Sequence, residues 1–151
     1  MSQQHQKINI PVIAEPGVEI PHYASLGASG ADVRAYLEQP LSIAAGETAV
    51  VPTGLYFEIP LGYEIQVRPR SGLAAKNGVT VLNTPGTIDA DYRGELKVIM
   101  INHGKEPFVV TPGMRIAQLV VAPVLQADFI VSEKLAVTAR GAGGLGHTGT
   151  N

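Results

Sequence analysis

Hydrophobic and polar residues alternate over short stretches of this chain. From Tyr63 to Arg68, Tyr, Ile and Val alternate with Glu, Gln and Arg, which is the period of a β-strand with one solvated face. Other short segments rich in Val and Ile are bounded by Gly, Pro or Asn, at residues 7–13, 48–59, 78–82, 94–102, 108–113 and 115–131. Turn-forming residues recur about every 8–12 residues, which predicts an all-β jelly roll or distorted β-barrel.

Residues 71–78 form the one segment with helical character. Ser71 is placed to cap the start of this short helix, and the Asn77-Gly78 pair is placed to close its end. No repeat, linker or low-complexity block divides the chain. We therefore expect a single β domain over residues 1–151, in which residues 140–151 form a glycine-rich C-terminal arm.

The composition excludes several classes of chemistry. The chain has no Cys, so disulfides, thiolate zinc sites and cysteine nucleophiles are excluded, and a reducing cytoplasm is permitted. Its formal charge is −2 and it has no basic tract, which argues against broad attraction to nucleic acid or to an anionic membrane. No apolar run approaches the roughly 18 residues of a membrane span. We expect a cytoplasmic protein that binds neither nucleic acid nor membrane.

The glycine-rich C-terminal segment raises a question of its own. Ordering ten such residues costs on the order of 10–20 kcal/mol, so this terminus is either disordered or closes over a ligand rich in hydrogen-bond acceptors. Gly141, Gly143 and Gly146 satisfy G-x-G-x-x-G, but only five residues follow Gly146. A dinucleotide fingerprint needs a strand before it, a helix after it and an acid about 20 residues later, so we reject that interpretation.

Two short segments carry candidate chemistry. Arg70 stands directly before the predicted helix beside Ser71 and Gly72, an arrangement that can hold a phosphate or can simply be a helix cap with a solvated arginine. Residues 83–95 have the turn residues of a hairpin. Within them, Asp89 and Asp91 share one face of an extended chain, which indicates metal or water activation, or else acids that cap a turn.

Taken together, five segments resemble the ordered motifs of the trimeric dUTPase family, the dUTP diphosphatases. They read "GASGADVRA", "PRSGL", "GTIDADYRGE", "GMRIAQLV" and "RGAGGLGHTG", and the resemblance covers residues from about 20 to 149. It implies a jelly-roll homotrimer with three active sites at subunit interfaces, where the C-terminal arm of one subunit closes over the nucleotide of another. The implied reaction is hydrolysis of dUTP to dUMP and pyrophosphate, which keeps uracil out of DNA and supplies dUMP for thymidylate synthesis.

The resemblance also implies roles for individual residues. Asp89 would orient and deprotonate a water that attacks the α-phosphorus. Mg²⁺ would be chelated mainly by the three phosphates and by waters, without a direct protein ligand and with Asp32 helping through water. The remaining residues implied to contact dUTP are Arg70, Ser71, Gly72 and Gln118 at the phosphates, Asn83 at the uracil edge, Tyr92 under the deoxyribose, Thr87, Ile88 and Lys97 elsewhere in the substrate site, and Arg140, Gly144, Leu145 and Gly146 in the arm.

One position departs from the family pattern. Most relatives carry Phe where this chain has Leu145, and that ring stacks on the base. Base stacking contributes roughly 1–3 kcal/mol, so the resemblance implies weaker closure of the arm here.

Two rival functions stay open at the level of sequence. One is a dCTP deaminase-like enzyme, whose motif reads "PRSS" where this chain has "PRSG" and which needs a Glu at the position of Ile99. The other is a catalytically silent nucleotide-binding jelly roll. The joint presence of Asp89, Tyr92, Arg70 and Arg140 argues against the silent form.

Overall fold

The computed structural model describes residues 5–151 and consists mainly of short β-strands. The strands are β1 (Val12–Ala14), β2 (His22–Tyr23), β3 (Ala31–Arg34), β4 (Leu41–Ile43), β5 (Thr48–Pro52), β6 (Leu55–Phe57), β7 (Tyr63–Arg68), β8 (Val79–Val81), β9 (Gly86–Ile88), β10 (Lys97–Asn102), β11 (Phe108–Val110) and β12 (Arg115–Pro123). The helix α1 (Ser71–Asn77) lies between β7 and β8.

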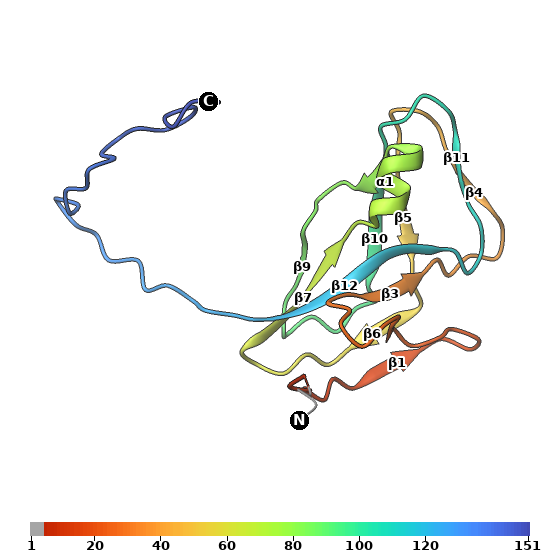
Figure 1. Cartoon of the computed structure of the whole chain (residues 1–151). Helices are drawn as coiled ribbons and strands as arrows, with labels where there is room; N and C mark the ends of the chain where they lie inside the picture. Colours follow the sequence, from red (N-terminus) through yellow and green to blue (C-terminus); the bar gives the residue numbers. More distant parts are fainter. Residues whose placement is uncertain (1–4) are drawn as a thin grey trace.

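The strands form several antiparallel sheets that wrap around one apolar interior (Figure 1). The largest sheet has the order β2-β3-β12-β7-β9, and a second has the order β5-β10-β8. Two further pairs, β1 with β6 and β4 with β11, complete the barrel-like wrap. This architecture confirms the predicted all-β, jelly-roll-like fold.

The alternation in the sequence decides which side of each strand faces the interior. In β7, Ile65 and Val67 are buried while Glu64 and Gln66 point away from the core. The same period operates in β10, whose inward residues Val98 and Met100 are almost fully buried. Apolar residues from all the larger sheets meet in one cluster, which fixes the relative positions of the strand ends.

The helix lies where the sequence predicts it, but its start is built differently. Gly78 closes α1 in the left-handed conformation, with φ of 68°, and its N–H is directed to the carbonyls of Leu73 and Ala74. The expectation that Ser71 caps the helix is wrong. Ser71 already lies in the first turn, and Arg70 occupies the cap position without a side-chain hydrogen bond to the helix. Within residues 5–151, no helix has the length and apolar character that crossing a membrane requires.

The last strand is shorter than the apolar segment at residues 115–131 predicts. β12 ends at Pro123, opposite Tyr63, because β7 begins there and offers no further backbone partner. The amide of Val124 makes one last hydrogen bond to the carbonyl of Gly62, at 2.9 Å. Residues 125–151 then extend away from the sheets, drawn in blue in Figure 1, and nearly all of them are exposed. The C-terminal arm of residues 140–151 is thus the last part of a longer exposed segment.

Candidate active site

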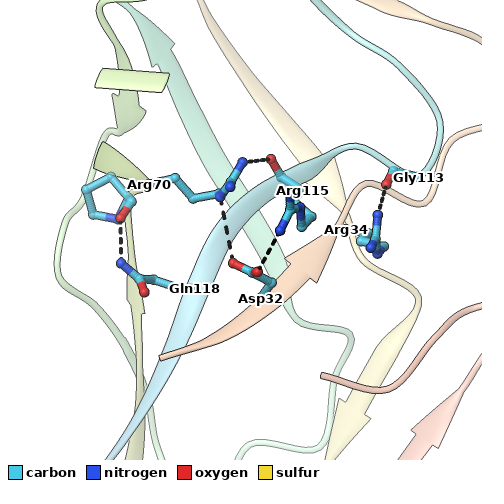
Figure 2. A network of polar contacts seen from close by, with 7 residues as sticks. Asp32, Arg34, Arg70, Gly113, Arg115 and Gln118 are labelled. Carbon is cyan, nitrogen blue, oxygen red and sulfur yellow. Dashed lines mark hydrogen bonds and ion pairs between the residues drawn. The ribbon is translucent and has the colours of Figure 1, made fainter. Parts of the chain in front are cut away.

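A carboxylate held between two arginines lies where β3 and β12 meet the end of β7. The Oδ1 atom of Asp32 is 3.7 Å from Nε of Arg70, and its Oδ2 atom is 3.3 Å from Nη1 of Arg115 (Figure 2). Arg70 also donates from Nη1 to the carbonyl of Arg115, at 3.2 Å. We call Asp32, Arg70, Arg115 and Gln118 the arginine cluster.

A β-bulge brings the two β12 members of this cluster to the same face of the sheet. Arg115 and Gln118 are three residues apart, and in a regular strand they would face opposite sides. The register of β12 against β3 shifts between Arg115 and Ala117, so that Arg115 lies opposite Arg34 and Gln118 lies opposite Asp32. Arg115 therefore joins the site, whereas the sequence marks it only as a polar residue in a strand-like context and assigns it no role.

Gln118 ties the strand to the segment that carries Arg70. Its Nε2 atom donates to the carbonyl of Pro69, at 3.1 Å (Figure 2). Pro69 directly precedes Arg70, Ser71 and Gly72, so the hydrogen bond anchors the start of that segment. Ser71 and Gly72 are exposed beside the cluster. The structure thus brings together the residues expected at the phosphates.

The electrostatics of the arginine cluster favour an anion. Two guanidinium groups face one carboxylate, which leaves a local excess of one positive charge. The Asp32 side chain is 17% exposed, whereas those of Arg70 and Arg115 are 29% and 45% exposed. The carboxylate is therefore the covered partner and the arginines keep donors on the solvent side. A guanidinium presents five N–H donors in a planar fork that matches phosphate oxygens.

Asp89 lies in a second location, directly after β9. The amide of Tyr92 donates to the carbonyl of Asp89 at 3.1 Å, which makes residues 89–92 a tight turn. The expectation that Asp89 and Asp91 share one face of an extended chain is therefore wrong, because Asp91 lies inside the turn. Both carboxylates are exposed. Asp89, at the strand end, is in reach of a ligand that lies against β9.

Tyr92 forms a half-exposed aromatic surface next to Asp89. Its hydroxyl donates to the carbonyl of Glu95 at 2.8 Å, and 44% of the residue is exposed. The ring lies over Gly94, where an added Cβ atom would be 2.7 Å from Cζ of the tyrosine. Glycine at position 94 leaves the space that this ring orientation needs.

The arginine cluster and Asp89 lie at opposite ends of the β7–β9 pair. The antiparallel register sets Ile65 opposite Ile88 and Val67 opposite Gly86, so Asp89 follows on at the level of Glu64. Arg68 ends β7 four residues further along, at a rise that gives roughly 14 Å of backbone, and Arg70 lies beyond it. One protomer therefore does not bring Asp89 to the residues expected at the phosphates.

The segment 83–95 is not a simple hairpin. Its first side, β9, pairs with β7, whereas the strand that follows, β10, pairs with β5 and β8. The turn at residues 89–92 thus crosses from one sheet to another. β8 and β10 pair antiparallel on either side of this segment, so a hairpin closes around it, but its long loop includes β9, which pairs with β7 instead.

The other expected substrate residues within the sheets lie in two places. Asn83 is exposed in the turn between β8 and β9, near the end of β7 that leads to Arg70. Thr87 and Ile88 belong to β9, and Lys97 begins β10 opposite Pro52. The Asn83 turn and the Asp89 turn therefore lie at opposite ends of β9, and Lys97 follows the Asp89 turn.

The expected arm residues lie far from the sheets, along the extended C-terminal segment (Figure 1). Arg140 donates from Nε to the carbonyl of Gly143, at 2.7 Å, while Gly144, Leu145 and Gly146 are largely exposed. Within one protomer the arm thus makes local contacts only, and its residues do not join the arginine cluster or Asp89.

Comparison with known proteins identifies the family to which this arrangement belongs. Residues 17–149 match the family model described as dUTPase. The chain belongs to the dUTPase family. Among curated dUTPase relatives, the deoxyuridine 5'-triphosphate nucleotidohydrolase of Chlamydia pneumoniae is 59% identical over 138 residues, which cover 91% of this chain and 95% of the relative.

Solved dUTPase structures share the fold at much lower identity. The dUTPase of Staphylococcus bacteriophage 80alpha with dUPNHPP superposes with a TM-score of 0.82 at 24% identity, covering 95% of this chain and 100% of the phage chain. A mutant dUTPase from phage phi11 of S. aureus, described as coordinating a structural Mg(II) ion, gives a TM-score of 0.74 at 21% identity, with 84% and 98% coverage. These similarities show that this chain has the same overall fold as the solved dUTPases.

Asp32 is the one carboxylate of the arginine cluster that could assist a cation. Among residues 5–151, no group of three or more His, Asp or Glu side chains is placed to hold a metal ion. Asp32 offers hard carboxylate oxygens at the edge of the cluster, but both are engaged by arginines. Mg²⁺ often keeps several waters and is bound through one or two carboxylates together with substrate phosphates, so Asp32 would assist such an ion through water.

Proposed function

We propose that this chain hydrolyses dUTP to dUMP and pyrophosphate. The observation that carries the proposal is the arginine cluster, an anion-binding constellation formed by three of the dUTPase motifs. Asp32, Arg70 and Gln118 come from widely separated parts of the sequence and converge at one place on the largest sheet. Membership of the dUTPase family supports the choice of dUTP as the anion.

The phosphates are bound by groups whose positions are fixed before substrate arrives. Arg70 is held by Asp32 and by the carbonyl of Arg115, so it loses little side-chain freedom on binding. Ser71, Gly72 and Gln118 contribute neutral donors to the remaining phosphate oxygens. A phosphate bound this way is positioned for in-line attack, which is where most of the rate enhancement in phosphoryl chemistry arises.

Asp89 acts as the general base in this proposal. Its carboxylate holds a water and accepts its proton while the oxygen attacks the α-phosphorus and the bond to the bridging oxygen breaks, so pyrophosphate leaves. General-base assistance contributes roughly 10²- to 10⁴-fold in rate. The exposed position of Asp89 at the end of β9 supports this role, because the carboxylate is accessible to both water and ligand.

The turn before β9 and the turn after it select the base and the sugar. The amide of Asn83 pairs with the uracil edge, and cytosine would leave buried groups unpaired at two positions. Tyr92 packs under the deoxyribose and leaves no room for a 2′-hydroxyl. Its orientation over Gly94 supports this part of the proposal. Thr87, Ile88 and Lys97 line the remainder of the substrate site.

Mg²⁺ is proposed as the cofactor. Asp32 would hold one of the waters of the ion, and the three phosphates would supply its other ligands. When bound, the ion neutralises negative charge on the phosphate chain. The structural Mg(II) ion described for the phage phi11 relative supports the capacity of this fold to hold such an ion.

We further propose that each active site is shared between subunits of a homotrimer. The separation of Asp89 from the arginine cluster within one protomer supports sharing, because a second copy can bring its own Asp89 to the cluster. The outward face of the β5-β10-β8 sheet offers an apolar contact surface. Val50 and Leu82 on it are 57% and 51% exposed, and Ile99 lies directly opposite Val50.

The C-terminal arm would complete the site of a neighbouring subunit. Residues 125–151 already extend away from their own sheets, and they carry Leu125, Phe129 and Ile130 almost fully exposed. Arg140 would then contact the terminal phosphate, and the backbone of Gly144 and Gly146 would donate to the phosphate chain, with Leu145 covering the base. The reaction would keep uracil out of DNA and supply dUMP for thymidylate synthesis, in the cytoplasm.

The decisive experiment compares the parent protein with Asp89→Asn. We expect the parent to release pyrophosphate from dUTP with Mg²⁺, and far more slowly from dCTP, dTTP or UTP. We expect Asp89→Asn to lose on the order of 10²-fold or more in kcat while it still binds dUpNHpp. In ¹⁸O-labelled water the label should enter dUMP. Label in pyrophosphate, or equal turnover by the variant, would overturn the mechanism.

The same assay tests the two rival functions. A deaminase would release ammonia from dCTP, but the position that would carry its acid holds Ile99, in the middle of β10 beside Val50. A silent nucleotide-binding protein would bind dUpNHpp and release no pyrophosphate from dUTP. No observation on the described residues favours either rival over hydrolysis.

A further inference from the structure

Gly30, directly before β3, lies beneath the side chain of Gln118. A Cβ atom added at position 30 would be 3.0 Å from Cδ and 3.1 Å from Cβ of Gln118, and closer still to Oε1. The last contact could be relieved by a rotation, but the Cβ atom of Gln118 moves only with the backbone of β12. Because the φ of Gly30 is not in the left-handed region, glycine is needed at this position for space rather than for backbone conformation.

The side chain that occupies this space is held in a defined position. The register places Gln118 opposite Asp32 on one side and opposite Arg68 on the other. Its Nε2 atom carries two N–H donors, and one of them goes to the carbonyl of Pro69 at 3.1 Å. The hydrogen bond to Pro69 fixes the plane of the amide and therefore also the direction of its second N–H. Both depend on the space that Gly30 leaves for the amide.

We propose that Gly30 is a positioning residue for the phosphate-binding part of the site. The missing side chain at position 30 seats the amide of Gln118 against Pro69, and this hydrogen bond in turn fixes the start of the segment that carries Arg70. A methyl group at position 30 displaces the amide, and both the Gln118 donor and the anchor at Pro69 are lost. The inference rests on the proposed function only in naming the phosphates of dUTP as the group that is bound.

The chain provides a matched control in the same loop. Gly27 is three residues earlier, its φ also lies outside the left-handed region, and an added Cβ atom there would meet no atom within 4 Å. Gly30→Ala and Gly27→Ala therefore add the same methyl group, but only the methyl group at position 30 clashes with Gln118. We expect Gly30→Ala to raise the KM for dUTP and the dissociation constant of dUpNHpp on the order of tenfold, with a smaller change in kcat. Gly27→Ala should match the parent in all three.

A double-mutant cycle with Gln118→Ala separates positioning from general damage to the fold. Truncating Gln118 to alanine removes Oε1 and Cδ, the two atoms nearest the added methyl group, and leaves only the 3.1 Å contact with Cβ. Gly30→Ala should therefore cost clearly less in the Gln118→Ala background than in the parent. If Gly30→Ala alone does not fold, the double variant should still fold and bind dUpNHpp as Gln118→Ala does.

Two results would overturn the positioning role. The first is a Gly30→Ala protein with the affinity of the parent, and the second is an undiminished tenfold loss in the Gln118→Ala background. Failure of the proposed function would look different, since the parent protein would then not hydrolyse dUTP at all. The affinities for dUpNHpp report on Gly30 independently of turnover.

Discussion

At the scale of single residues, the arginine cluster shows where sequence reasoning reaches its limit. The sequence marks Asp32, Arg115 and Gln118 as polar residues in otherwise ordinary contexts and Arg70 as a candidate phosphate ligand. The structure brings these four residues together. The sequence gives no role to Arg115, which in a regular strand would lie on the face opposite Gln118 because the two are three residues apart. The bulge that reverses this is a backbone irregularity without a glycine or proline to mark it.

The charge of Arg115 leads to a specific prediction. We expect Arg115→Gln to raise the KM for dUTP roughly three- to tenfold, with kcat changed less, because the variant loses one positive charge beside the phosphates and one partner of Asp32. Steady-state kinetics at low and high salt would measure this effect. The difference from the parent should shrink as ionic strength rises.

Arg34 is the natural control for this variant. It lies opposite Arg115 in the register but pairs with Glu19 and with the carbonyl of Gly113, away from Asp32. Arg34→Gln removes the same charge from the same sheet. Equal effects of the two variants would show that the cluster geometry does not matter and that only net charge does.

At the scale of elements, the predictions succeed where local sequence decides the structure. The strands follow the alternation, and α1 ends where Asn77-Gly78 predicts, since a left-handed glycine closes a helix whatever surrounds it. The predictions fail where pairing with a strand distant in the sequence determines the structure. β12 stops at Pro123 because β7 begins opposite it, and the segment 83–95 is split between sheets because β9 pairs backward with β7.

A substitution at Leu145 tests whether the C-terminal arm closes over the substrate. Leu145 is fully exposed in the free chain, so any change in substrate affinity on mutation must come from contacts made in the closed state. We expect Leu145→Phe to lower the KM for dUTP several-fold, because an aromatic ring adds stacking worth roughly 1–3 kcal/mol. Leu135→Phe, elsewhere on the same exposed segment, is the control. An unchanged or higher KM for Leu145→Phe would mean that residue 145 does not reach the base.

At the scale of the whole molecule, the sharing of sites can be tested with two inactive proteins. Arg70→Ala removes the proposed phosphate ligand and Asp89→Asn removes the proposed base, so each variant alone should be inactive. When the two are unfolded together and refolded as a mixture, random assembly places an intact Arg70 and an intact Asp89 in about a quarter of the sites. We expect activity to return to about that fraction of the parent value.

The same mixture without unfolding serves as the control, because intact assemblies exchange subunits only as fast as they dissociate. If each site were contained in one chain, every site in the refolded mixture would carry one of the two defects and no activity would return. The resemblance implies sites at subunit interfaces, but the motif order does not indicate which copy supplies Arg70 and which supplies Asp89.

Asp89 and Arg70 lie at opposite ends of one antiparallel strand pair, so the proposed mechanism would make catalysis a collective property. Under this proposal, a newly made chain would stay inert until it meets others. Specific activity should consequently climb with protein concentration and collapse on dilution, in step with the population of assembled particles. For a cell, the amount of working catalyst would then respond more than proportionally to how much of the polypeptide is synthesised.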